Sequence, residues 1–384
     1  MFKVNLLVLS TVISLFISLF LSYFLIKVKT EHKVSNHLFS AFLILSSIDM
    51  SGILFDFIIE DPSNIGMFRN SIAFLSLPTF YFYVLSVCYC DFELKVKHLL
   101  HLFPFLTVNL ILLPRFYLVN TSLKIKFLEG RSSMLEIQFI HIFFHIQILI
   151  YIIAVFLILR NARKIYLENY AGSSITSLKW LFELTLAISI FYVIAFIKNI
   201  FKFSDYPYVS EWVKIGLFVF QLLIISWYLF NTLNNPNLFR NIDSKLKLVS
   251  DIILEDKNIE TIPVTDLEYN SEIEKLKNYM IDKKPFLNPS VTIQDIAKDL
   301  QITPRELSVL INHTLGQHFF DFVNTYRIEN AMTILKDPAK SKETILEILY
   351  EVGFNSKSSF NTAFKKHTGF TPTEYRKTQD RSAL

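Results

Sequence analysis

Long apolar runs fill the first 230 residues of this chain and constrain its fold more than any other feature. Seven of them reach the length of about 20 residues that a helix needs to cross the hydrocarbon core of a bilayer. They lie at residues 4–26, 38–59, 68–90, 99–118, 137–159, 178–200 and 212–230. Hydrophobic residues make up 52% of the whole chain and charged residues only 19%, which is more apolar than a water-soluble protein needs to be. The sequence therefore predicts a seven-helix transmembrane domain over residues 1–230.

Lysine and arginine are unevenly divided between the loops that join these runs. With the N-terminus outside, nine of them fall in the inner loops and five in the outer loops. Because short cytoplasmic loops are enriched in these residues, the count favours an outside N-terminus. An odd number of spans then places the C-terminal part of the chain in the cytoplasm. The first run is too long for the core of a signal peptide and lacks a small-residue cleavage site, so we expect it to remain as a span.

A few ionisable side chains lie inside the predicted spans, where they are costly and suggest function. Asp49 and Asp56 are seven residues apart and share a helix face, and His141 and His145 have a spacing of four. These four residues are the candidate lining of a sensor cavity. The alternative is that such polar side chains bond between helices or reach toward the membrane surface. The histidine pair has no visible third ligand, so no metal site or cofactor is predicted.

A polar, helical half follows the apolar half. Residues 231–270 form the predicted linker, either with a helix that transmits a signal or as a loose tether. From residue 271 to residue 384 the apolar residues recur with helical period and show no strand-like alternation. The sequence therefore predicts an all-α protein: the seven-helix bundle, then a cytoplasmic all-helical domain over residues 271–384.

The soluble half contains the same pattern twice, at about residues 292–316 and 343–369. Each copy is a predicted helix, a tight turn and a second helix that ends at a glycine, which is a helix-turn-helix unit. Thr303-Pro304-Arg305-Glu306 predicts a capped helix start, and Thr371-Pro372-Thr373-Glu374 predicts another. A long amphipathic helix at residues 319–335 separates the units and, at about 25 Å, could hold two recognition helices in successive major grooves.

The second helix of each unit is predicted to leave short polar and basic side chains exposed. In the first unit, Leu307, Leu310 and Ile311 form the buried stripe. A solvated helix face would look the same in one unit, but two matching copies favour contact with DNA. The candidate base contacts are Arg305, Ser308, Val309 and Asn312 in the first unit and Lys357, Ser358, Asn361 and Thr362 in the second; the candidate phosphate contacts are Lys365, Lys366 and Arg376.

Several motifs of the soluble half occur together in one known family. They are Asn324-x-x-Arg327, Gly353-Phe354-x-Ser356, Phe364-Lys365-Lys366 and Thr371-Pro372-x-x-Tyr375-Arg376. This half resembles the AraC/XylS family of bacterial transcription regulators, which implies that the second helix of each unit enters the major groove. The chain departs from the pattern at Gln301, where the second unit has Gly353, and at Leu349, where the family usually has alanine. The layout of spans followed by such a domain is similar to membrane-bound regulators of the Bacteroidetes type.

We therefore expect a membrane-bound one-component transcription regulator, not an enzyme, in the inner membrane of a bacterium. Its expected partners are double-stranded promoter DNA, the lipid bilayer, an unidentified signal and, as a further option, a second copy of the chain. No catalytic constellation is visible in the soluble half. One alternative is a membrane transporter or enzyme whose attached DNA-binding domain reports on its activity. Another is a module that uses its helices to bind protein.

Overall fold

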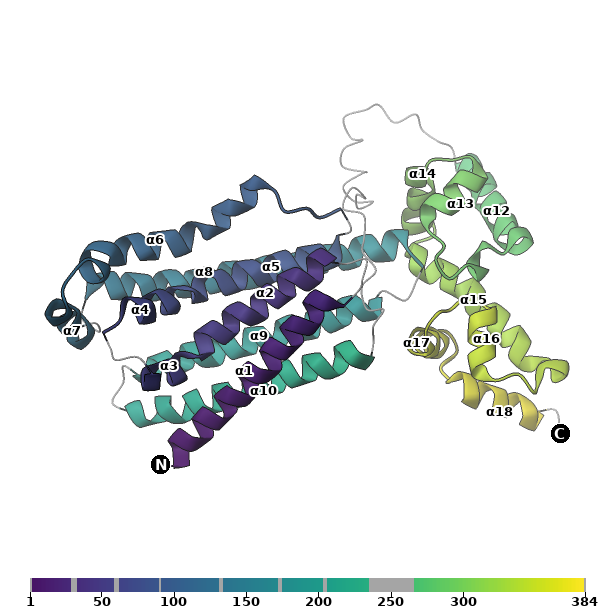
Figure 1. Cartoon of the computed structure of the whole chain (residues 1–384). Helices are drawn as coiled ribbons and strands as arrows, with labels where there is room; N and C mark the ends of the chain where they lie inside the picture. The colour runs from purple at the N-terminus through teal and green to yellow at the C-terminus, as the bar shows by residue number, and fades with distance from the viewer. Residues whose placement is uncertain are drawn as a thin grey trace. The chain divides into compact units, whose positions relative to one another are not determined.

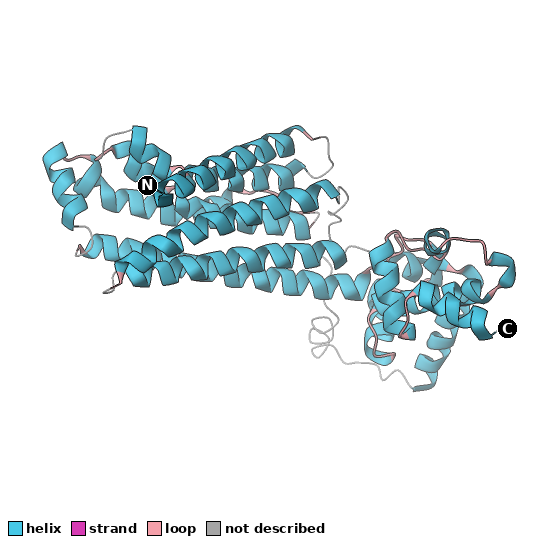
Figure 2. Cartoon of the chain, turned by 90° about the horizontal axis from the view of Figure 1, so that it is seen from below, coloured by secondary structure: helices cyan, strands magenta, loops and turns pink. Residues whose placement is uncertain are grey.

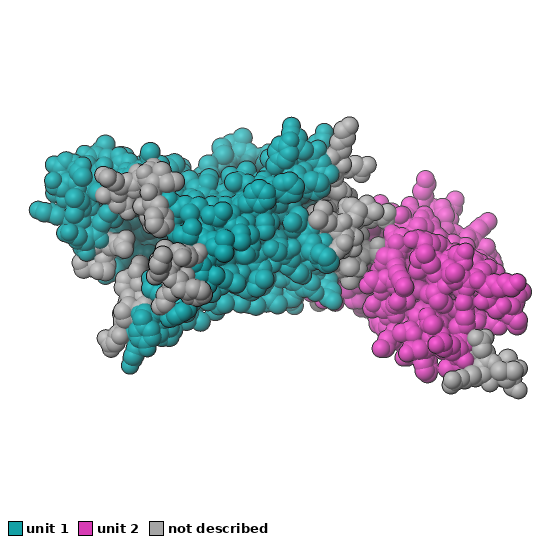
Figure 3. Space-filling model, turned by 60° about the horizontal axis from the view of Figure 1, so that its bottom comes forward, with its two compact units in different colours: residues 1–160, 179–241 teal, residues 161–178, 242–384 magenta. Residues whose placement is uncertain are grey.

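The computed structural model describes residues 2–28, 33–58, 62–89, 91–130, 134–171, 175–202, 206–234 and 266–382. Every named element in these residues is helical (Figure 2), and an isolated antiparallel bridge joins Tyr170 and Thr292. The predicted all-α class is therefore confirmed. The chain divides into two compact units (Figure 3), residues 1–160 with 179–241 and residues 161–178 with 242–384.

Unit 1 contains the apolar helices. Its elements (Figure 1) are α1 (Phe2–Lys27), α2 (Lys33–Met50), α3 (Gly52–Ile58), α4 (Asn64–Ser71), α5 (Ala73–Cys88), η1 (Val96–Leu102), α6 (Phe103–Leu112), η2 (Leu113–Tyr117), α7 (Thr121–Gly130), most of α8 (Leu135–Asn169), α9 (Ile175–Lys202) from Lys179 onward, and α10 (Pro207–Asn234). The last residues of α8, from Asn161, and the first of α9 belong to unit 2.

Six helical stretches of the described residues are long and apolar enough to cross a membrane. They are Leu6–Lys27, Asn64–Cys88, Val96–Tyr117, Leu135–Asn169, Leu178–Phe201 and Tyr208–Asn231. They correspond to six of the seven predicted spans. The described part of the remaining one, residues 38–58, lies in α2 and α3, with a break at Ser51. A seventh crossing there stays a prediction, since α2 has many serines and α3 is short.

The serines of α2 lie in the contacts between helices. This helix packs against α1 and α5. The Ser22 hydroxyl of α1 donates to the Ser40 carbonyl at 3.1 Å, and the Ser40 hydroxyl donates to the Ser22 carbonyl at 3.2 Å. The Ser35 hydroxyl donates to the carbonyl of Ser86 in α5 at 3.1 Å. Small residues of this kind let helix backbones approach closely in an apolar medium, which explains why α2 is both polar and buried.

Unit 2 contains the predicted pair of helix-turn-helix units. Its elements after the linker are α12 (Asp266–Lys283), η3 (Pro285–Leu287), α13 (Ile293–Leu300), α14 (Pro304–Val309), η4 (Leu310–Thr314), α15 (Phe319–Lys336), η5 (Pro338–Lys340), α16 (Ile345–Glu351), α17 (Lys357–Thr368) and α18 (Pro372–Ser382). Most of the predicted linker, residues 235–265, lies outside the described residues.

Each helix-turn-helix unit has an apolar core of its own, and α15 contributes to both. The first core includes Leu307 and Ile311 with Phe322 of α15. The second includes Phe360 and Phe364 with Ile328 of α15, among other residues. Helix α15 is therefore the shared element that joins the two units. Because its two ends lie in different cores, the packing of α15 fixes how the units are placed on each other.

Candidate nucleic-acid interface

The first unit runs from α13 through a turn into α14. The Thr303 hydroxyl accepts from the Glu306 N–H at 3.2 Å, and the Glu306 carboxylate accepts from the Thr303 N–H at 2.8 Å. This is the predicted capping box, with Pro304 at the first helical position. At the turn, Gln301 is left-handed with φ 57°, the conformation that Gly353 takes in the second unit. The predicted buried stripe of Leu307, Leu310 and Ile311 is confirmed.

One residue of the first predicted reading face is not exposed. Arg305 is exposed and Val309 and Asn312 are half-buried, but Ser308 is only 4% exposed. The predicted exposure of Ser308 is therefore wrong. At 100° per residue, Ser308 lies about 60° from Ile311 around the helix axis, so a wide buried stripe includes a side chain this small.

Asn312 uses its side chain inside the protein. Its amide nitrogen donates to the carbonyl and to the hydroxyl of Ser308, both at 3.0 Å. Its amide oxygen accepts from the Phe319 N–H at 3.3 Å, at the first residue of α15. Asn312 thereby satisfies a backbone donor at a helix start, the role that a capping residue has. Its position at the π-helical turn η4, which continues α14, brings it to that helix start.

The second unit turns at Gly353, and only glycine fits there. Its φ is +89°, and a Cβ built on it would lie 2.4 Å from the Phe286 carbonyl oxygen and 2.8 Å from that of Leu287. The turn that follows α16 thus packs directly on η3. Helix α17 then begins under the predicted cap, with the Ser356 hydroxyl accepting from the Ser359 N–H at 3.1 Å, and it ends at the left-handed Gly369.

The predicted reading face of α17 is accessible. Lys357, Ser358 and Thr362 are exposed and Asn361 is half-buried, while Phe360 and Phe364 on the opposite face are fully buried. All four predicted base contacts therefore lie on the surface of one twelve-residue helix. Their amide, hydroxyl and ammonium groups are the donors and acceptors that base edges in the major groove can bond.

The three predicted phosphate contacts differ in their surroundings. Lys365 is exposed. The Lys366 ammonium pairs with the Asp321 carboxylate at 2.7 Å, although its side chain is 69% exposed. The Arg376 guanidinium donates to the Glu343 carbonyl at 2.7 Å, and its other nitrogens Nε and Nη2 are buried. Of the three residues, Arg376 is thus positioned to hold α18 to the segment before α16 rather than to meet a phosphate.

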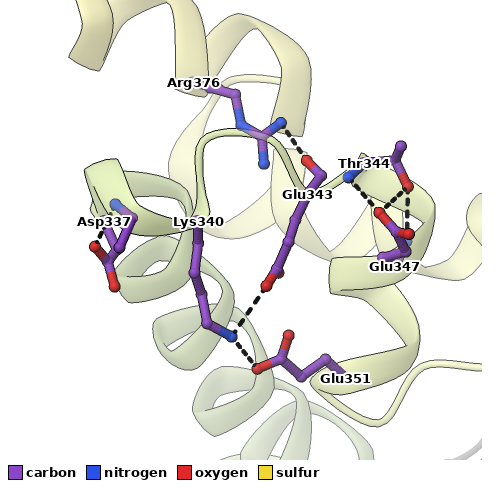
Figure 4. A network of polar contacts seen from close by, with 8 residues as sticks. Asp337, Lys340, Glu343, Thr344, Glu347, Glu351 and Arg376 are labelled. Atoms are coloured by element: carbon purple, nitrogen blue, oxygen red, sulfur yellow. Dashed lines mark hydrogen bonds and ion pairs between the residues drawn. The ribbon is translucent and has the colours of Figure 1, made fainter.

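A polar network surrounds that Arg376 contact (Figure 4). The Lys340 ammonium pairs with Glu343 at 3.4 Å and with Glu351 at 2.5 Å, joining η5 to the end of α16. The Glu347 carboxylate accepts from the Thr344 N–H at 2.7 Å and closes a capping box at the start of α16. These contacts hold η5 and α16 together, so the network has a structural role in the second helix-turn-helix unit.

Arg327 of the Asn324-x-x-Arg327 motif lies at the junction of the two units. It is 1% exposed. Its Nε donates to the Phe286 carbonyl at 2.7 Å and its Nη2 to the Asn288 carbonyl at 2.8 Å, both in the segment before the first unit. Its guanidinium carbon lies 5.4 Å from the ring centre of Phe354 in the second unit. Burial lowers the pKa of Arg327 to about 10, so the group is charged at neutral pH. The sequence motif identified this residue but gave it no role.

The predicted sensor residues of unit 1 are only partly described. Asp49 is exposed at the end of α2, and its carbonyl accepts from Arg69 at 2.9 Å. His145 Nδ1 lies 2.7 Å from the His141 carbonyl, so this contact occupies one of its ring nitrogens. The side chain of Asp56 lies outside the described residues. Within the part of the chain that the structure describes, no group of three or more His, Cys, Asp or Glu side chains could hold a metal.

A cavity of about 70 Å³ lies between α2, α9 and α10 of unit 1. Aromatic and aliphatic side chains line most of it, with Ser46, Tyr192 and Gln221 as polar members. The complete lining is Phe39, Phe42, Leu43, Ser46, Leu184, Ile188, Phe191, Tyr192, Gln221, Ile224, Ile225 and Tyr228. Asp49, His141 and His145 are not among them. The sequence pattern missed this cavity because its lining is mainly apolar and comes from helices far apart in the chain.

Comparisons with known proteins agree with the geometry of unit 2. A helix-turn-helix domain family matches residues 296–378. The chain is 33% identical over 116 residues to the transcriptional regulatory protein YesN of Bacillus subtilis, a match that covers 30% of each protein. It is 27% identical over 207 residues to the HTH-type transcriptional regulator YdeC of Bacillus subtilis, covering 45% of this chain and 69% of YdeC.

A third relative is a putative AraC-like transcription regulator of Streptomyces lividans, 31% identical over 88 residues, which are 23% of this chain and 28% of the relative. The chain thus spans less than a third of the length of YesN and of the Streptomyces protein. No solved structure matches the chain. The C-terminal part of the chain is an AraC-type helix-turn-helix domain.

Proposed function

We propose that this chain, given its AraC-type helix-turn-helix domain, is a membrane-bound transcription regulator that binds promoter DNA in a sequence-specific manner. The observation that carries the proposal is a pair of helix-turn-helix units on one shared helix, with an accessible polar and basic face on α17. In this kind of module the second helix of a unit lies in the major groove and its side chains bond base edges. The domain has the parts that such binding needs.

Within the domain we assign base reading mainly to the second unit. Lys357, Ser358, Asn361 and Thr362 are its base contacts, and Lys365 contacts phosphate. The first unit contributes Arg305 and Val309, since Ser308 and Asn312 bond to each other and Asn312 also caps α15. The first unit therefore serves chiefly to position the domain on the duplex, a role that contacts to the DNA backbone fulfil.

We further propose that unit 1 lies in the inner membrane of a bacterium, with the N-terminus outside. Large apolar side chains such as Phe16, Leu110 and Leu149 are exposed on its helices, as lipid-facing residues are. The loop charges favour this orientation. A reporter enzyme fused after residue 384 tests it. A reporter that works only in the cytoplasm must be active, and one that works only outside must be inactive.

The signal that controls the domain is proposed to act at the cavity between α2, α9 and α10. Its lining suits a small, mainly apolar molecule with one hydrogen-bonding group. Ile188→Trp would fill the cavity and should leave target genes fixed in one state across growth conditions. Leu186→Trp, on the lipid-exposed side of the same helix, is the matched control and should leave regulation as in wild type. Equal regulation in both variants would remove the cavity from the proposal.

Selection of binding sites from random duplexes tests the DNA proposal, with the full chain purified in detergent. We expect enrichment of two short motifs about one helical turn apart if both units read bases, and of one motif if the first unit only positions the domain. Binding should weaken steeply as salt rises, because phosphate contacts release counterions. Absence of any enriched motif would refute sequence-specific binding. Enrichment would also identify the target promoters.

A further inference from the structure

A segment far upstream in the sequence forms part of unit 2, the compact unit that contains both helix-turn-helix units. Residues 161–178 belong to unit 2, and the structure describes 161–171 of them continuously. Ala171 is 2% exposed and lies in the apolar core of the first helix-turn-helix unit, together with Leu276 and Phe286. This segment, residues 161–171, is named here the α8 extension. It was not part of the domain predicted at residues 271–384.

Two further contacts hold the α8 extension on the first unit. Tyr170 forms the antiparallel bridge with Thr292, the residue that caps α13. The ring centre of Tyr166 lies 6.5 Å from that of Phe320 in α15, and Tyr166 stacks on Tyr170 at 5.3 Å. The extension therefore contacts both the start of α13 and the start of the shared helix α15.

The α8 extension has the residue pattern of a helix that packs on protein along one side. Its buried residues recur at helical spacing, and they are Ala162, Ile165, Tyr166 and Asn169. Arg163 and Lys164 are exposed. This narrow buried stripe with basic residues beside it differs from the apolar surface of the preceding part of α8, where Ile142, Leu149 and Ile153 are exposed.

The α8 extension ends at the guanidinium of Arg327, which lies at the junction of the two helix-turn-helix units. Arg327 Nη1 donates to the Ala171 carbonyl at 2.7 Å. The same side chain holds the carbonyls of Phe286 and Asn288 before the first unit and faces the Phe354 ring of the second. A buried guanidinium loses stability when one of its donors loses its acceptor. Departure of Ala171 would remove one acceptor, so the junction between the units depends on whether the extension is docked.

We propose that the α8 extension is a regulatory contact through which helix α8 controls how the two helix-turn-helix units are oriented for DNA. Docked, it supplies one of the acceptors of Arg327 and holds both helix-turn-helix units in one arrangement. Undocked, it leaves Arg327 short of an acceptor, and the units reorient. The inference rests on the proposed function and adds a route for the signal besides the linker at residues 231–270.

A pair of introduced cysteines tests whether the extension docks in the native protein. Tyr170→Cys with Thr292→Cys, in a chain whose Cys88 and Cys90 are replaced by alanine, should form a disulfide in membranes on mild oxidation, because bridged residues lie within reach of one. Lys164→Cys with Thr292→Cys is the matched control, since Lys164 is exposed on the same extension. Equal cross-linking of the two pairs would overturn the proposal.

A second experiment tests the effect on DNA, with the full chain in nanodiscs and two duplexes that carry the selected site. The double-site duplex is long enough for both helix-turn-helix units, and the single half-site duplex is trimmed to the part that α17 contacts. Tyr166→Ala should weaken binding to the double site by about tenfold and leave binding to the single half-site unchanged. Lys164→Ala is the control and should bind the double site more tightly than Tyr166→Ala does. Oxidation of the Tyr170→Cys/Thr292→Cys pair in the Tyr166→Ala background should restore wild-type affinity.

The outcomes separate the two proposals. If the wild-type chain has no sequence preference, the proposed function itself fails. If the wild-type chain prefers its sites and Tyr166→Ala binds both duplexes as wild type does, the DNA-binding function stands and the regulatory contact is refuted. Equal weakening on both duplexes that the disulfide does not reverse means damage to the domain, and this also refutes the proposed coupling.

Discussion

The first helix-turn-helix unit ends in a helix of six α-helical residues followed by a π-helical turn, whereas the second ends in an unbroken α-helix of 12 residues. Both units have a capped start and a fully buried apolar stripe. They differ in what they offer to a partner. The second helix presents four predicted reading residues on its surface, while the first has Ser308 and Asn312 bonded within the protein.

This difference shows that a repeated sequence pattern need not mean a repeated role. The buried stripe and caps set where each helix lies, and both units keep them. The residues outside the stripe and the caps can differ between the two helix-turn-helix units. In the first helix-turn-helix unit, Asn312 stabilises the start of α15. This unit therefore supports the helix that joins the two helix-turn-helix units. The predictions that follow use one unit as the control for the other.

Substitutions at the turn residues should give the largest difference in stability between the two helix-turn-helix units. Gly353→Ala would place a Cβ 2.4 Å from a backbone oxygen at a φ of +89°, and we expect a loss of roughly 3 kcal/mol of stability. Gln301→Gly removes a left-handed side chain at the matching turn and should change stability by less than about 1 kcal/mol. Hydrogen exchange of the amides of α17 and α14 in the full chain measures both. Equal protection in the two variants would contradict the close packing of Gly353 on η3.

Changes at the predicted base contacts should give the next largest effect, on the base preference of DNA binding. Lys357→Ala and Asn361→Ala remove side chains that bond base edges, and we expect each to cost about 1–3 kcal/mol of discrimination at particular base pairs. Ser308→Ala, the buried counterpart in the first unit, should leave the base preference unchanged. Site selection with each variant measures the preference. A changed preference in Ser308→Ala would show that the first helix reads bases through a conformation other than this one.

Asn312 should affect stability and not recognition. Asn312→Ala removes the acceptor for the Phe319 N–H at the start of α15, and loss of such a cap costs about 1 kcal/mol. The midpoint of thermal unfolding of unit 2 should fall, while the selected DNA motif stays the same. Asn361→Ala is the opposite case, because it should change the motif with little effect on unfolding. A motif that changes in Asn312→Ala would return this residue to the reading face.

The two lysines at the end of α17 should differ in their effect on salt dependence. Lys365→Ala should weaken binding to all sequences alike and reduce the slope of affinity against salt by about one charge. Lys366→Ala should reduce the slope less, because Lys366 pairs with Asp321. Titration of one duplex at several salt concentrations measures both slopes. Equal reductions would mean that DNA displaces Asp321 from Lys366.

The smallest expected effect is on stability at acid pH, and it concerns the second helix-turn-helix unit. Hydrogen bonds from Thr344 lower the pKa of Glu347, and those from Thr371 lower the pKa of Glu374. A carboxylate with a lowered pKa in the folded state contributes stability above the ordinary pKa of glutamate, about 4.3. That contribution is lost as the pH falls through the lowered value. Unfolding of Glu347→Gln/Glu374→Gln should therefore depend less on pH below about 4.3 than that of wild type.

The features that the sequence predicted correctly depend on residues close together in the chain. The capping boxes at Thr303 and Thr371 and the buried stripe of α14 need partners three or four residues away, so a pattern in one segment is sufficient to find them. Ser308 was harder, because it lies at the edge of a stripe whose width depends on what packs against it.

Contacts between distant segments could not be read from local patterns. The bond between Ala171 and Arg327 joins residues 156 positions apart, and alanine gives no sign that its carbonyl is an acceptor. The cavity of unit 1 likewise depends on how three helices pack. The α8 extension directly follows the apolar run that ends at residue 159, so the sequence pattern predicts a loop there.

The Ala171 contact has a consequence for how this protein can be taken apart or recombined. A fusion that transfers residues 266–382 to another membrane protein would carry both helix-turn-helix units but would leave behind one of the two acceptors that Arg327 uses for Nη1. The smallest transferable cassette is therefore discontinuous in the gene. An engineer who wants to exchange DNA specificity between such regulators should replace α14 and α17 in place, and leave the α8 extension with the α15 that it contacts.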